Sequence, residues 1–266
     1  MASAARPFRI AHISDLHCGG TYFEPNLLER AISEVNELGP DMVICTGDLT
    51  TFGFKHEYQM ARSYLDRIRC DSFVVIPGNH DARNVGYVHF EDLFGERSSV
   101  LRKEGVTVVA VDSTEPDLDH GQIGRGRYGW IEEQFAAEPA HLRIFVLHHH
   151  LLPVPGTGRE RNVVYDAGDA LECLLRAGVH LVLSGHKHVP YAWRLENLFV
   201  VNAGTASTTR VRGKTRPCYN VIEATPERVS VFRKYPFHDR EAIISFDPRT
   251  FEYEKDPSLL GETARG

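Results

Sequence analysis

The chain has 266 residues, of which 42% are hydrophobic, and its formal net charge is -6. This length and apolar content suit one sizeable core, and they exclude a disordered or low-complexity chain. The acidic balance argues against general electrostatic attraction to nucleic acid or to an anionic membrane, so no stable nucleic acid complex is expected. An anionic substrate would need local positive charge to attract it.

The cysteines and the start of the chain favour a reducing, cytoplasmic location. The five cysteines are Cys18, Cys45, Cys70, Cys173 and Cys218. They form no C-x-x-C pair, and their odd number fits a reducing compartment better than a disulfide framework. The first residues lack a long apolar core and no window approaches a transmembrane span, so we expect a cytoplasmic protein. The oligomeric state stays open, with a homo-oligomer among the possibilities.

The first third of the chain alternates short apolar runs with amphipathic segments. Strands are predicted at residues 8–13, 41–46 and 72–78, and helices at residues 25–39 and 57–69. The helical segments carry apolar residues at helical spacing, and the first of them ends at Gly39 and Pro40, a good stop signal. The order strand, helix, strand, helix, strand is typical of an α/β fold.

The alternation continues to about residue 190 and then changes. Further strands are predicted at residues 106–113, 142–149 and 179–185, with helices at residues 128–138 and 166–178. Closely spaced strands follow at residues 191–196, 198–204, 218–224 and 228–235. Their short turns suggest an antiparallel portion that completes the sheets. The tail from Pro236 is less regular, and we expect it to pack as an extra hairpin or to extend to a partner subunit.

Polar residues that can bind metal ions stand at the carboxyl ends of five predicted strands. In chain order these ends carry Asp15 and His17, then Asp48, then Asn79, His80 and Asp81, then His148, His149 and His150, then His186 and His188. Open α/β sheets build their sites at this edge. Each motif alone has a structural alternative, because an Asp after a strand caps turns and a Gly-Asn pair forms tight turns. Together the five strand ends favour one metal site.

The sequence SGHKHVP, residues 184–190, places two histidines one residue apart. In an extended segment alternate side chains share a face. His186 and His188 are therefore expected to point the same way, and Lys187 is expected to point the opposite way. Two imidazoles would then be offered to one site.

The chain carries a series of motifs in the order D-x-H, G-D, G-N-H-D, a histidine-rich strand end and G-H-x-H. This series resembles that of the calcineurin-like metallophosphoesterase superfamily. The motifs run from Asp15 to His188. The resemblance implies a four-layer α/β/β/α sandwich with mixed sheets and a dinuclear metal centre between the sheet ends. It also implies a catalytic domain at residues 1–235, followed by a C-terminal extension at residues 236–266 that packs on the same domain or on a partner subunit.

The resemblance also assigns metal ligands. One metal ion is held by Asp15, His17 and His188, the other by Asn79, His149 and His186, and the carboxylate of Asp48 bridges the two. A bridging carboxylate offsets the repulsion between two cations, and mixed nitrogen and oxygen ligands suit Fe, Mn, Zn, Co or Ni rather than Ca. Such a metal pair lowers the pKa of a shared water molecule, and the hydroxide that results is the implied nucleophile. Two leucines follow the triple histidine where the family usually has a proline, so His148 is the alternative to His149.

His80 has a separate role in this resemblance. It faces the substrate rather than a metal ion, and it stabilises the phosphoryl charge or protonates the leaving oxygen. The adjacent Asp81 is then expected to orient His80 and to raise its pKa, which suits a general acid near neutral pH. The alternative is a histidine that is hydrogen-bonded to a loop.

The motifs also narrow the class of phosphoester that the chain is expected to hydrolyse. The phosphoprotein phosphatase branch shows G-D-x-x-D-R-G and G-N-H-E, whereas this chain has GDLTTFG and GNHD. The chain resembles bacterial class III cyclic-nucleotide phosphodiesterases, which implies hydrolysis of small phosphodiesters, 3',5'-cyclic nucleotides among them. A phosphomonoesterase, a glycerophosphodiesterase, a nucleotide-sugar pyrophosphatase and a noncatalytic protein-binding scaffold stay open. The candidates to hold a phosphate or nucleoside are Tyr22, Arg83, Arg125, Arg127, Arg210 and Arg212.

Overall fold

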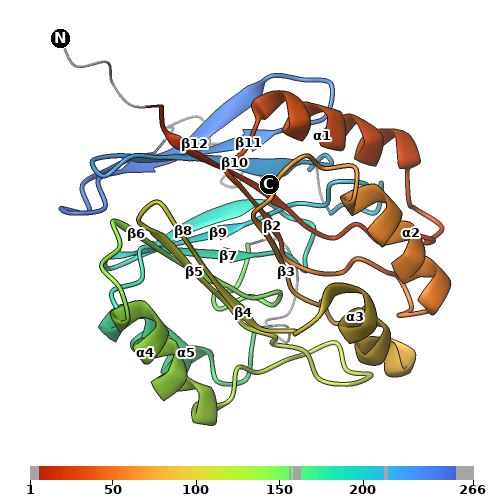
Figure 1. Cartoon of the computed structure of the whole chain (residues 1–266), viewed down its shortest axis with the longest axis horizontal. Coiled ribbons are helices and arrows are strands. Elements are labelled where there is room, and N and C mark those ends of the chain that lie inside the picture. Colours follow the sequence, from red (N-terminus) through yellow and green to blue (C-terminus); the bar gives the residue numbers. More distant parts are fainter. Residues whose placement is uncertain (1–5, 156, 158–162, 213–214, 256–266) are drawn as a thin grey trace.

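The computed structural model of the chain describes residues 6–155, 157, 163–212 and 215–255. In that part of the chain two β-sheets pack face to face, and helices cover the outer face of each sheet (Figure 1). Both sheets contain parallel and antiparallel pairs. The predicted fold class, an α/β/β/α sandwich with mixed sheets, is therefore confirmed.

The first sheet combines the amino-terminal strands with the carboxyl-terminal ones. Its strands among the described residues, in spatial order, are β13 (Tyr253–Lys255), β12 (Arg240–Phe246), β11 (Val229–Lys234), β10 (Tyr219–Ala224), β1 (Phe8–Ile13), β2 (Met42–Cys45) and β3 (Phe73–Val75). β1, β2 and β3 run parallel, and the other pairs are antiparallel. The described part of the tail after Pro236 thus adds β12 and β13 to the edge of this sheet. The predicted domain boundary at residue 235 stays a prediction.

The second sheet is built from the middle of the chain. Its strands among the described residues, in spatial order, are β4 (Ser99–Lys103), β5 (Val106–Ala110), β6 (Leu142–Val146), β7 (Leu181–Ser184), β9 (Leu198–Asn202) and β8 (Tyr191–Leu195). β4 is not among the strands predicted from the sequence. β9 was predicted to belong to an antiparallel portion, but it pairs parallel with β7 and antiparallel only with β8.

The helices divide between the two outer faces (Figure 1). Those of the first sheet are α1 (Pro25–Leu38), α2 (Lys55–Leu65) and α3 (Gly86–Phe94), and those of the second are α4 (Tyr128–Ala136) and α5 (Ala167–Arg176). Short 3-10 turns at Arg83–Val85 and Arg125–Arg127 precede α3 and α4. As predicted, α1 stops at Gly39, whose φ of 59° is a left-handed value that glycine adopts at little cost. α3 is not among the helices predicted from the sequence.

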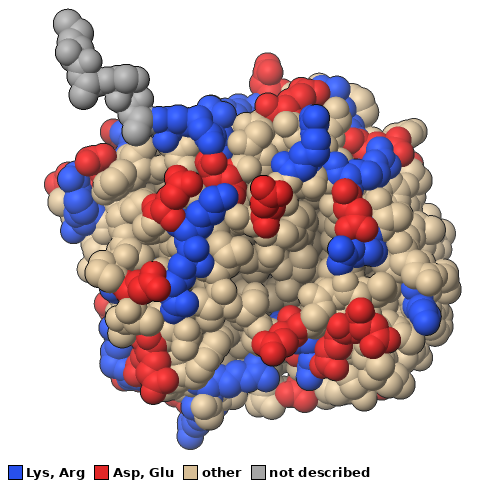
Figure 2. Space-filling model, in the orientation of Figure 1, with Lys and Arg blue, Asp and Glu red and all other residues tan. Residues whose placement is uncertain are grey.

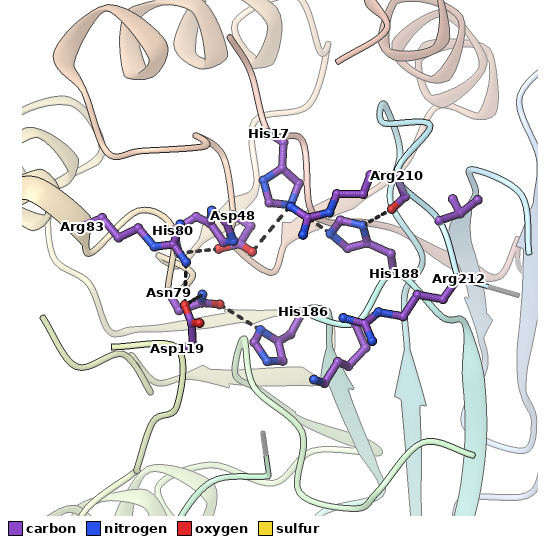
Figure 3. Close-up of a pocket in the computed structure, with 12 residues that line it drawn as sticks. His17, Asp48, Asn79, His80, Arg83, Asp119, His186, His188, Arg210 and Arg212 are labelled. Atoms are coloured by element: carbon purple, nitrogen blue, oxygen red, sulfur yellow. Dashed lines mark hydrogen bonds and ion pairs between the residues drawn. The ribbon is translucent and has the colours of Figure 1, made fainter. Parts of the chain in front are cut away.

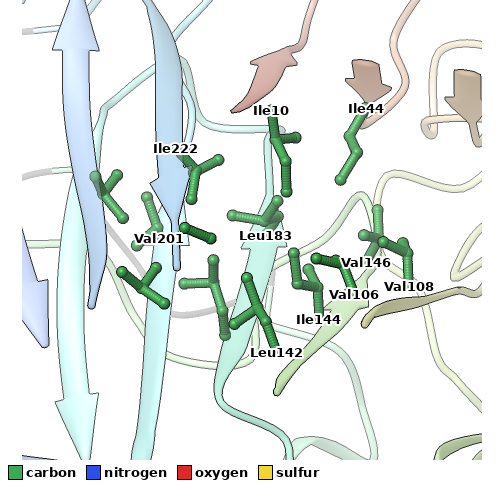
Figure 4. Packing of buried hydrophobic residues seen from close by; sticks show 14 of the residues in the cluster. Ile10, Ile44, Val106, Val108, Leu142, Ile144, Val146, Leu183, Val201 and Ile222 are labelled. Atoms are coloured by element: carbon green, nitrogen blue, oxygen red, sulfur yellow. The ribbon is translucent and has the colours of Figure 1, made fainter. Parts of the chain in front are cut away.

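The main apolar core lies between the sheets (Figure 4). Ile10 and Ile44 of the first sheet, and Ile144, Val146 and Leu183 of the second, are fully buried there. Burying each such side chain contributes about 1.5–3 kcal/mol relative to leaving it exposed. Because helices cover the outer faces as well, the central strands are apolar on both faces, as parallel strands of α/β proteins usually are.

The surface carries both signs of charge. On the face shown in Figure 2, Lys and Arg are interspersed with Asp and Glu. No helix among the described residues is long and apolar enough to cross a membrane. The cytoplasmic location and the homo-oligomer stay predictions.

Candidate metal centre

A polar cavity of about 480 Å³ opens where the carboxyl ends of strands from both sheets meet (Figure 3). Its lining residues are His17, Asp48, Asn79, His80, Arg83, Asp119, His186, Lys187, His188, Arg210, Val211 and Arg212. The first of these follow β1, β2 and β3 of one sheet, and His186 and His188 follow β7 of the other. The fold therefore brings together the strand ends that the sequence singled out.

The backbone at the site is held in an unusual conformation. Several non-glycine residues there have positive φ: Asp15 at 55°, His17 at 48°, Asp48 at 52°, His186 at 77° and His188 at 56°. Left-handed φ is uncommon outside glycine and persists only where surrounding contacts impose it. Hydrogen bonds between loops supply these contacts, because the amides of Asp15 and His17 donate to the carbonyls of Gly47 and Asp48 at 2.9 Å.

Glycine allows the loop after β7 to approach the end of β1. A Cβ atom at Gly185 would lie 2.0 Å from Ser14 Oγ and 2.5 Å from Asp15 Oδ2. With no Cβ there, the amide of His186 donates to both carboxylate oxygens of Asp15, at 3.1 and 3.0 Å. The two sheets are thereby joined at the floor of the cavity.

A first group of donor atoms consists of Asp15, His17 and His188. Their ligand atoms lie within 4.8 Å of one another. His17 Nε2 is 2.9 Å from His188 Nε2, and His188 Nε2 is 3.3 Å from Asp15 Oδ1. Two ring nitrogens and a carboxylate oxygen thus converge on one point.

A second group consists of Asp48, His148 and His186, whose ligand atoms also lie within 4.8 Å of one another. The Asn79 Oδ1 atom joins them, at 2.8 Å from His186 Nδ1 and 3.1 Å from His148 Nε2. His148 Nε2 is 3.4 Å from Asp48 Oδ2, which is itself 3.7 Å from His17 Nε2 of the first group. The Asp48 carboxylate therefore lies between the two groups.

Carbonyl groups behind the histidines orient their rings. His188 Nδ1 donates to the carbonyl of Arg210, and His148 Nδ1 donates to the carbonyl of Thr46, each at 2.6 Å. Because Nδ1 carries the proton in each bond, Nε2 turns its lone pair into the site, which is the usual arrangement of metal-binding histidines. Lone pairs that converge in this way repel one another unless a cation or proton lies between them, so the donor set fits transition-metal ions.

The charges at the site influence each other strongly. Burial raises the pKa of the Asp48 carboxyl, but nearby His148 and His80 outweigh burial and hold that pKa well below its usual range. Burial lowers the pKa of His148, but Asp48 outweighs it and raises this pKa to about 9. Burial and two neighbouring imidazoles, His149 and His148, lower the pKa of His186 well below its usual value. A proton on His148 thus balances Asp48 in the absence of a metal ion.

The two consecutive histidines make different contacts in the structure. His148 faces the second group, whereas His149 turns its Nδ1 to Ser113 Oγ at 2.8 Å. The expected ligand His149 is therefore outside the groups that the structure brings together, although its ring lies 4.8 Å from that of His186. The alternative that the sequence left open, His148, takes this place.

Asp81 does not orient His80 as expected. The Asp81 carboxylate accepts hydrogen bonds from the amides of Gly78, Leu49 and Thr50 and from the Thr50 hydroxyl, at 2.7–3.0 Å. These bonds hold the loop after β2 to the loop after β3. His80 instead donates from Nδ1 to the carbonyl of Thr51 at 2.7 Å. A ring nitrogen of His80 also lies within 4.8 Å of the ligand atoms of His17 and Asp48, and His80 itself lines the cavity.

The expected orientation of Lys187 is also wrong. β7 ends at Ser184, and the left-handed backbone at His186 and His188 interrupts the extended geometry on which that expectation rested. Lys187 consequently lines the same cavity as its two neighbours. Burial and nearby Arg212 lower the pKa of Lys187 to about 8, which leaves its ammonium group mostly charged at neutral pH.

The six candidate substrate residues divide evenly. Arg83, Arg210 and Arg212 line the cavity, and Tyr22, Arg125 and Arg127 do not. Arg125 pairs with Asp169 at 2.7 Å, and Arg127 donates to the carbonyl of Asp112. Asp119, which is not among the predicted site residues, pairs with Arg83 at 2.5 Å on the cavity wall. No motif marked Asp119, because it lies in an irregular loop.

Solved structures share this fold. The purple acid phosphatase PPD1 from yellow lupin superposes with a TM-score of 0.68 at 13% identity, over 95% of this chain and 53% of that chain. A structure of PhoD superposes with a TM-score of 0.67 at 10% identity, over 95% of this chain and 72% of that chain. At such low identity these matches establish the fold alone.

Curated relatives are somewhat more similar in sequence. A probable cyclic nucleotide phosphodiesterase of a Synechococcus species is 26% identical over 70% of this chain and 76% of its own length. The 3',5'-cyclic adenosine monophosphate phosphodiesterase CpdA of Escherichia coli K12 is 27% identical over 71% of this chain and 72% of its own length. The family model for calcineurin-like phosphoesterases matches residues 8–190, which include both groups of donor atoms. The chain therefore belongs to the calcineurin-like metallophosphoesterase family.

Proposed function

We propose that the protein is a dinuclear metal-dependent phosphodiesterase that hydrolyses small phosphodiesters, 3',5'-cyclic nucleotides among them. The observation that carries this proposal is the position of Asp48. Its carboxylate oxygen lies 3.7 Å from His17 Nε2 of the first group and 3.4 Å from His148 Nε2 of the second. A carboxylate placed there can bridge two cations and offset their mutual repulsion.

In this proposal each group holds one metal ion. The first ion takes Asp15, His17 and His188, the second takes Asn79, His148 and His186, and Asp48 serves both. Mixed imidazole, amide and carboxylate ligands suit Fe, Mn, Zn, Co or Ni. Two such ions would supply an activated water as nucleophile and a positive charge against the phosphoryl oxygens.

His80 is the residue we assign to the leaving group. Its amide donates to Asp48 Oδ1 at 2.9 Å, which fixes the loop, and its ring reaches the cavity with Nδ1 bonded to Thr51. A protonated Nε2 can donate to the departing oxygen. Asp81 supports this arrangement as a positioning residue, since it holds the two loops together without contacting the His80 ring.

Two observations support a diester rather than a monoester. The curated relatives described above are named as cyclic nucleotide phosphodiesterases. The chain also lacks the G-D-x-x-D-R-G and G-N-H-E motifs expected of the phosphoprotein phosphatase branch. Cations at the cavity explain how an acidic protein can bind an anionic ester.

The test is metal content per chain, paired with hydrolysis of bis-(p-nitrophenyl) phosphate, p-nitrophenyl phosphate and a cyclic nucleotide before and after chelation. We expect about two transition-metal ions per chain and diesterase activity that the chelator removes. Less than one ion, with no activity after addition of Mn, Fe or Zn, would contradict the proposal and favour the noncatalytic scaffold. If p-nitrophenyl phosphate were hydrolysed faster than bis-(p-nitrophenyl) phosphate, the protein would be a phosphomonoesterase rather than a phosphodiesterase.

The His80→Ala variant separates the leaving-group role from metal binding. With a cyclic nucleotide, whose leaving oxygen is an alkoxide that needs a proton, we expect the variant to retain the metal ions and to lose about 100-fold or more in rate, the scale of general acid catalysis. The matched control is His89→Ala, since His89 lies on α3 and does not line the cavity. Loss of metal ions from the His80 variant would instead make His80 a ligand.

A further inference from the structure

One side of the cavity carries more positive charge than a singly charged phosphodiester requires. Lys187, Arg210 and Arg212 all line this side, near His186 and His188. In Figure 3 Arg210 lies beside His17 and His188, and Arg212 lies on the side of His186. Arg212 and Lys187 line the same part of the cavity, so the two cations repel each other.

These cations lack the carboxylate partners that neutralise the opposite wall. There, Arg83 pairs with Asp119 at 2.5 Å. Within the described part of the chain, no carboxylate lies within 4.0 Å of the charged nitrogens of Lys187, Arg210 or Arg212. Arg212 donates instead to the neutral carbonyl of Thr157 at 3.0 Å.

Lys187 is largely buried, whereas Arg210 and Arg212 are exposed at the cavity. Lys187 is only 7% exposed, although lysine is rarely buried unless it is paired. Burying a charge near a like charge destabilises the protein unless an anion compensates it. A bound anionic group that contacts Lys187 and Arg212 would remove this cost.

We propose that Lys187 and Arg212, with Arg210 beside them, form a second anion subsite, which selects phosphodiesters that carry an additional phosphate monoester group. The inference rests on the proposed phosphodiesterase function. The two metal ions would receive the phosphoryl group that is cleaved, and the subsite would receive the additional phosphate. Arginine and lysine both bind phosphate well, arginine through its planar set of donors and lysine as a point charge.

Two nucleoside esters test the inference because they differ in one phosphate. One is thymidine 5'-(p-nitrophenyl phosphate), and the other is the same ester with a phosphate at the 3' oxygen. In each hydrolysis the oxygen of water bonds to the 5' phosphorus, the bond from phosphorus to the nitrophenyl oxygen breaks, and nitrophenolate leaves while the water proton goes to solvent. The measured quantity is the ratio of kcat/KM for the two esters.

For the unmodified protein we expect the 3'-phosphorylated ester to be preferred about 10-fold to 100-fold, which is the scale of charged hydrogen bonds. Lys187→Met and Arg212→Met should each reduce this ratio about 10-fold, mainly through KM of the phosphorylated ester. Arg69→Met is the control. Arg69 is exposed and precedes β3, whereas the cavity lies after the carboxyl end of that strand, so this variant loses one positive charge and should leave the ratio unchanged.

Thermal unfolding gives a second readout that does not depend on activity. Without phosphate in the buffer, Lys187→Met should raise Tm by a few degrees, because one of two repelling cations is removed. If both esters are hydrolysed equally fast, or if the Lys187 and Arg212 variants keep the full ratio, the subsite is wrong and the phosphodiesterase proposal stands. If neither ester is hydrolysed by the metal-loaded protein, the proposed function fails first.

Discussion

The inter-sheet core and the site loops lie end to end along the same strands, yet they are built in opposite ways. The site loops are residues 14–18, 46–51, 78–82, 147–150 and 185–188. In the core, apolar side chains such as Ile10, Ile44 and Ile144 are buried on regular strands (Figure 4). In the site loops, most carboxylates and imidazoles are buried as well, and Asp15, His17, Asp48, His186 and His188 adopt left-handed φ.

This difference shows how stability and chemistry are divided in the molecule. Each left-handed non-glycine residue costs about 1–3 kcal/mol, and converging lone pairs add electrostatic cost. The core supplies the stabilisation that lets this strain persist. Changes in the core should therefore affect stability more than rate, and changes in the site loops should affect rate more than stability.

The largest effect is expected for Asp48→Asn. An amide cannot bridge two cations as a carboxylate does, so we expect metal pairing to be lost and the rate to fall by about 1,000-fold or more. Metal analysis and hydrolysis of bis-(p-nitrophenyl) phosphate measure both. The control is Glu34→Gln, because Glu34 is a buried carboxylate that pairs with Lys234 and Arg30 far from the cavity. A variant of Asp48 that keeps both metal ions would contradict the bridging role.

The converse effect is expected in the core. Ile144→Ala should lower the free energy of unfolding by about 2–5 kcal/mol, since it opens a cavity between the sheets. Urea unfolding measures this loss, and the rate of the folded variant should stay within about 3-fold. Leu118→Ala is the control, because Leu118 is 42% exposed and should change stability by less than about 0.5 kcal/mol. A large loss of rate in folded Ile144→Ala would show that the core and the site loops are not separable.

A comparison of His148→Asn with His149→Asn sharpens the boundary of the metal centre. We expect the His148 variant to lose about one metal ion per chain and about 100-fold in rate, because a ligand is removed. The His149 variant should retain both ions and lose less than about 10-fold, because its ring supports Ser113 and His186 from outside. Metal analysis of the two purified variants decides between them, and the reverse pattern would restore His149 as the ligand.

The smallest effect concerns pH and a histidine remote from the site. Burial and nearby Arg143 lower the pKa of His180 to about 4 in the folded protein. The unfolded chain therefore binds more protons below pH 6.5, and this part of the stability is lost as pH falls toward 4. Both the unmodified protein and His180→Asn should lose unfolding free energy between pH 7 and pH 5. The loss should be smaller in the variant by about 1 kcal/mol, a value that allows for screening of the charge by solvent. Urea unfolding at both pH values measures it, and an unchanged loss would refute the shift.

The choice between His148 and His149 shows where prediction from sequence stopped. Ile144 and Val146 of β6 face the inter-sheet core, whereas Phe145 and Leu147 face the helices. His148 continues the inward alternation and reaches the site, and His149 continues the outward one. A strand that is apolar on both faces does not reveal which residues point inward, so the sequence could not decide.

The sequence by itself determined the alternation of strands and helices, the class of fold and the kinds of metal-binding residue at the strand ends, because periodicity and motif order are local properties. Only the tertiary structure decided which imidazole enters the second group, that Thr51 rather than Asp81 orients His80, and that Lys187 faces the cavity. Each of these depends on contacts between loops from different strands. Such contacts also impose the left-handed backbone at the site, which is uncommon for residues other than glycine.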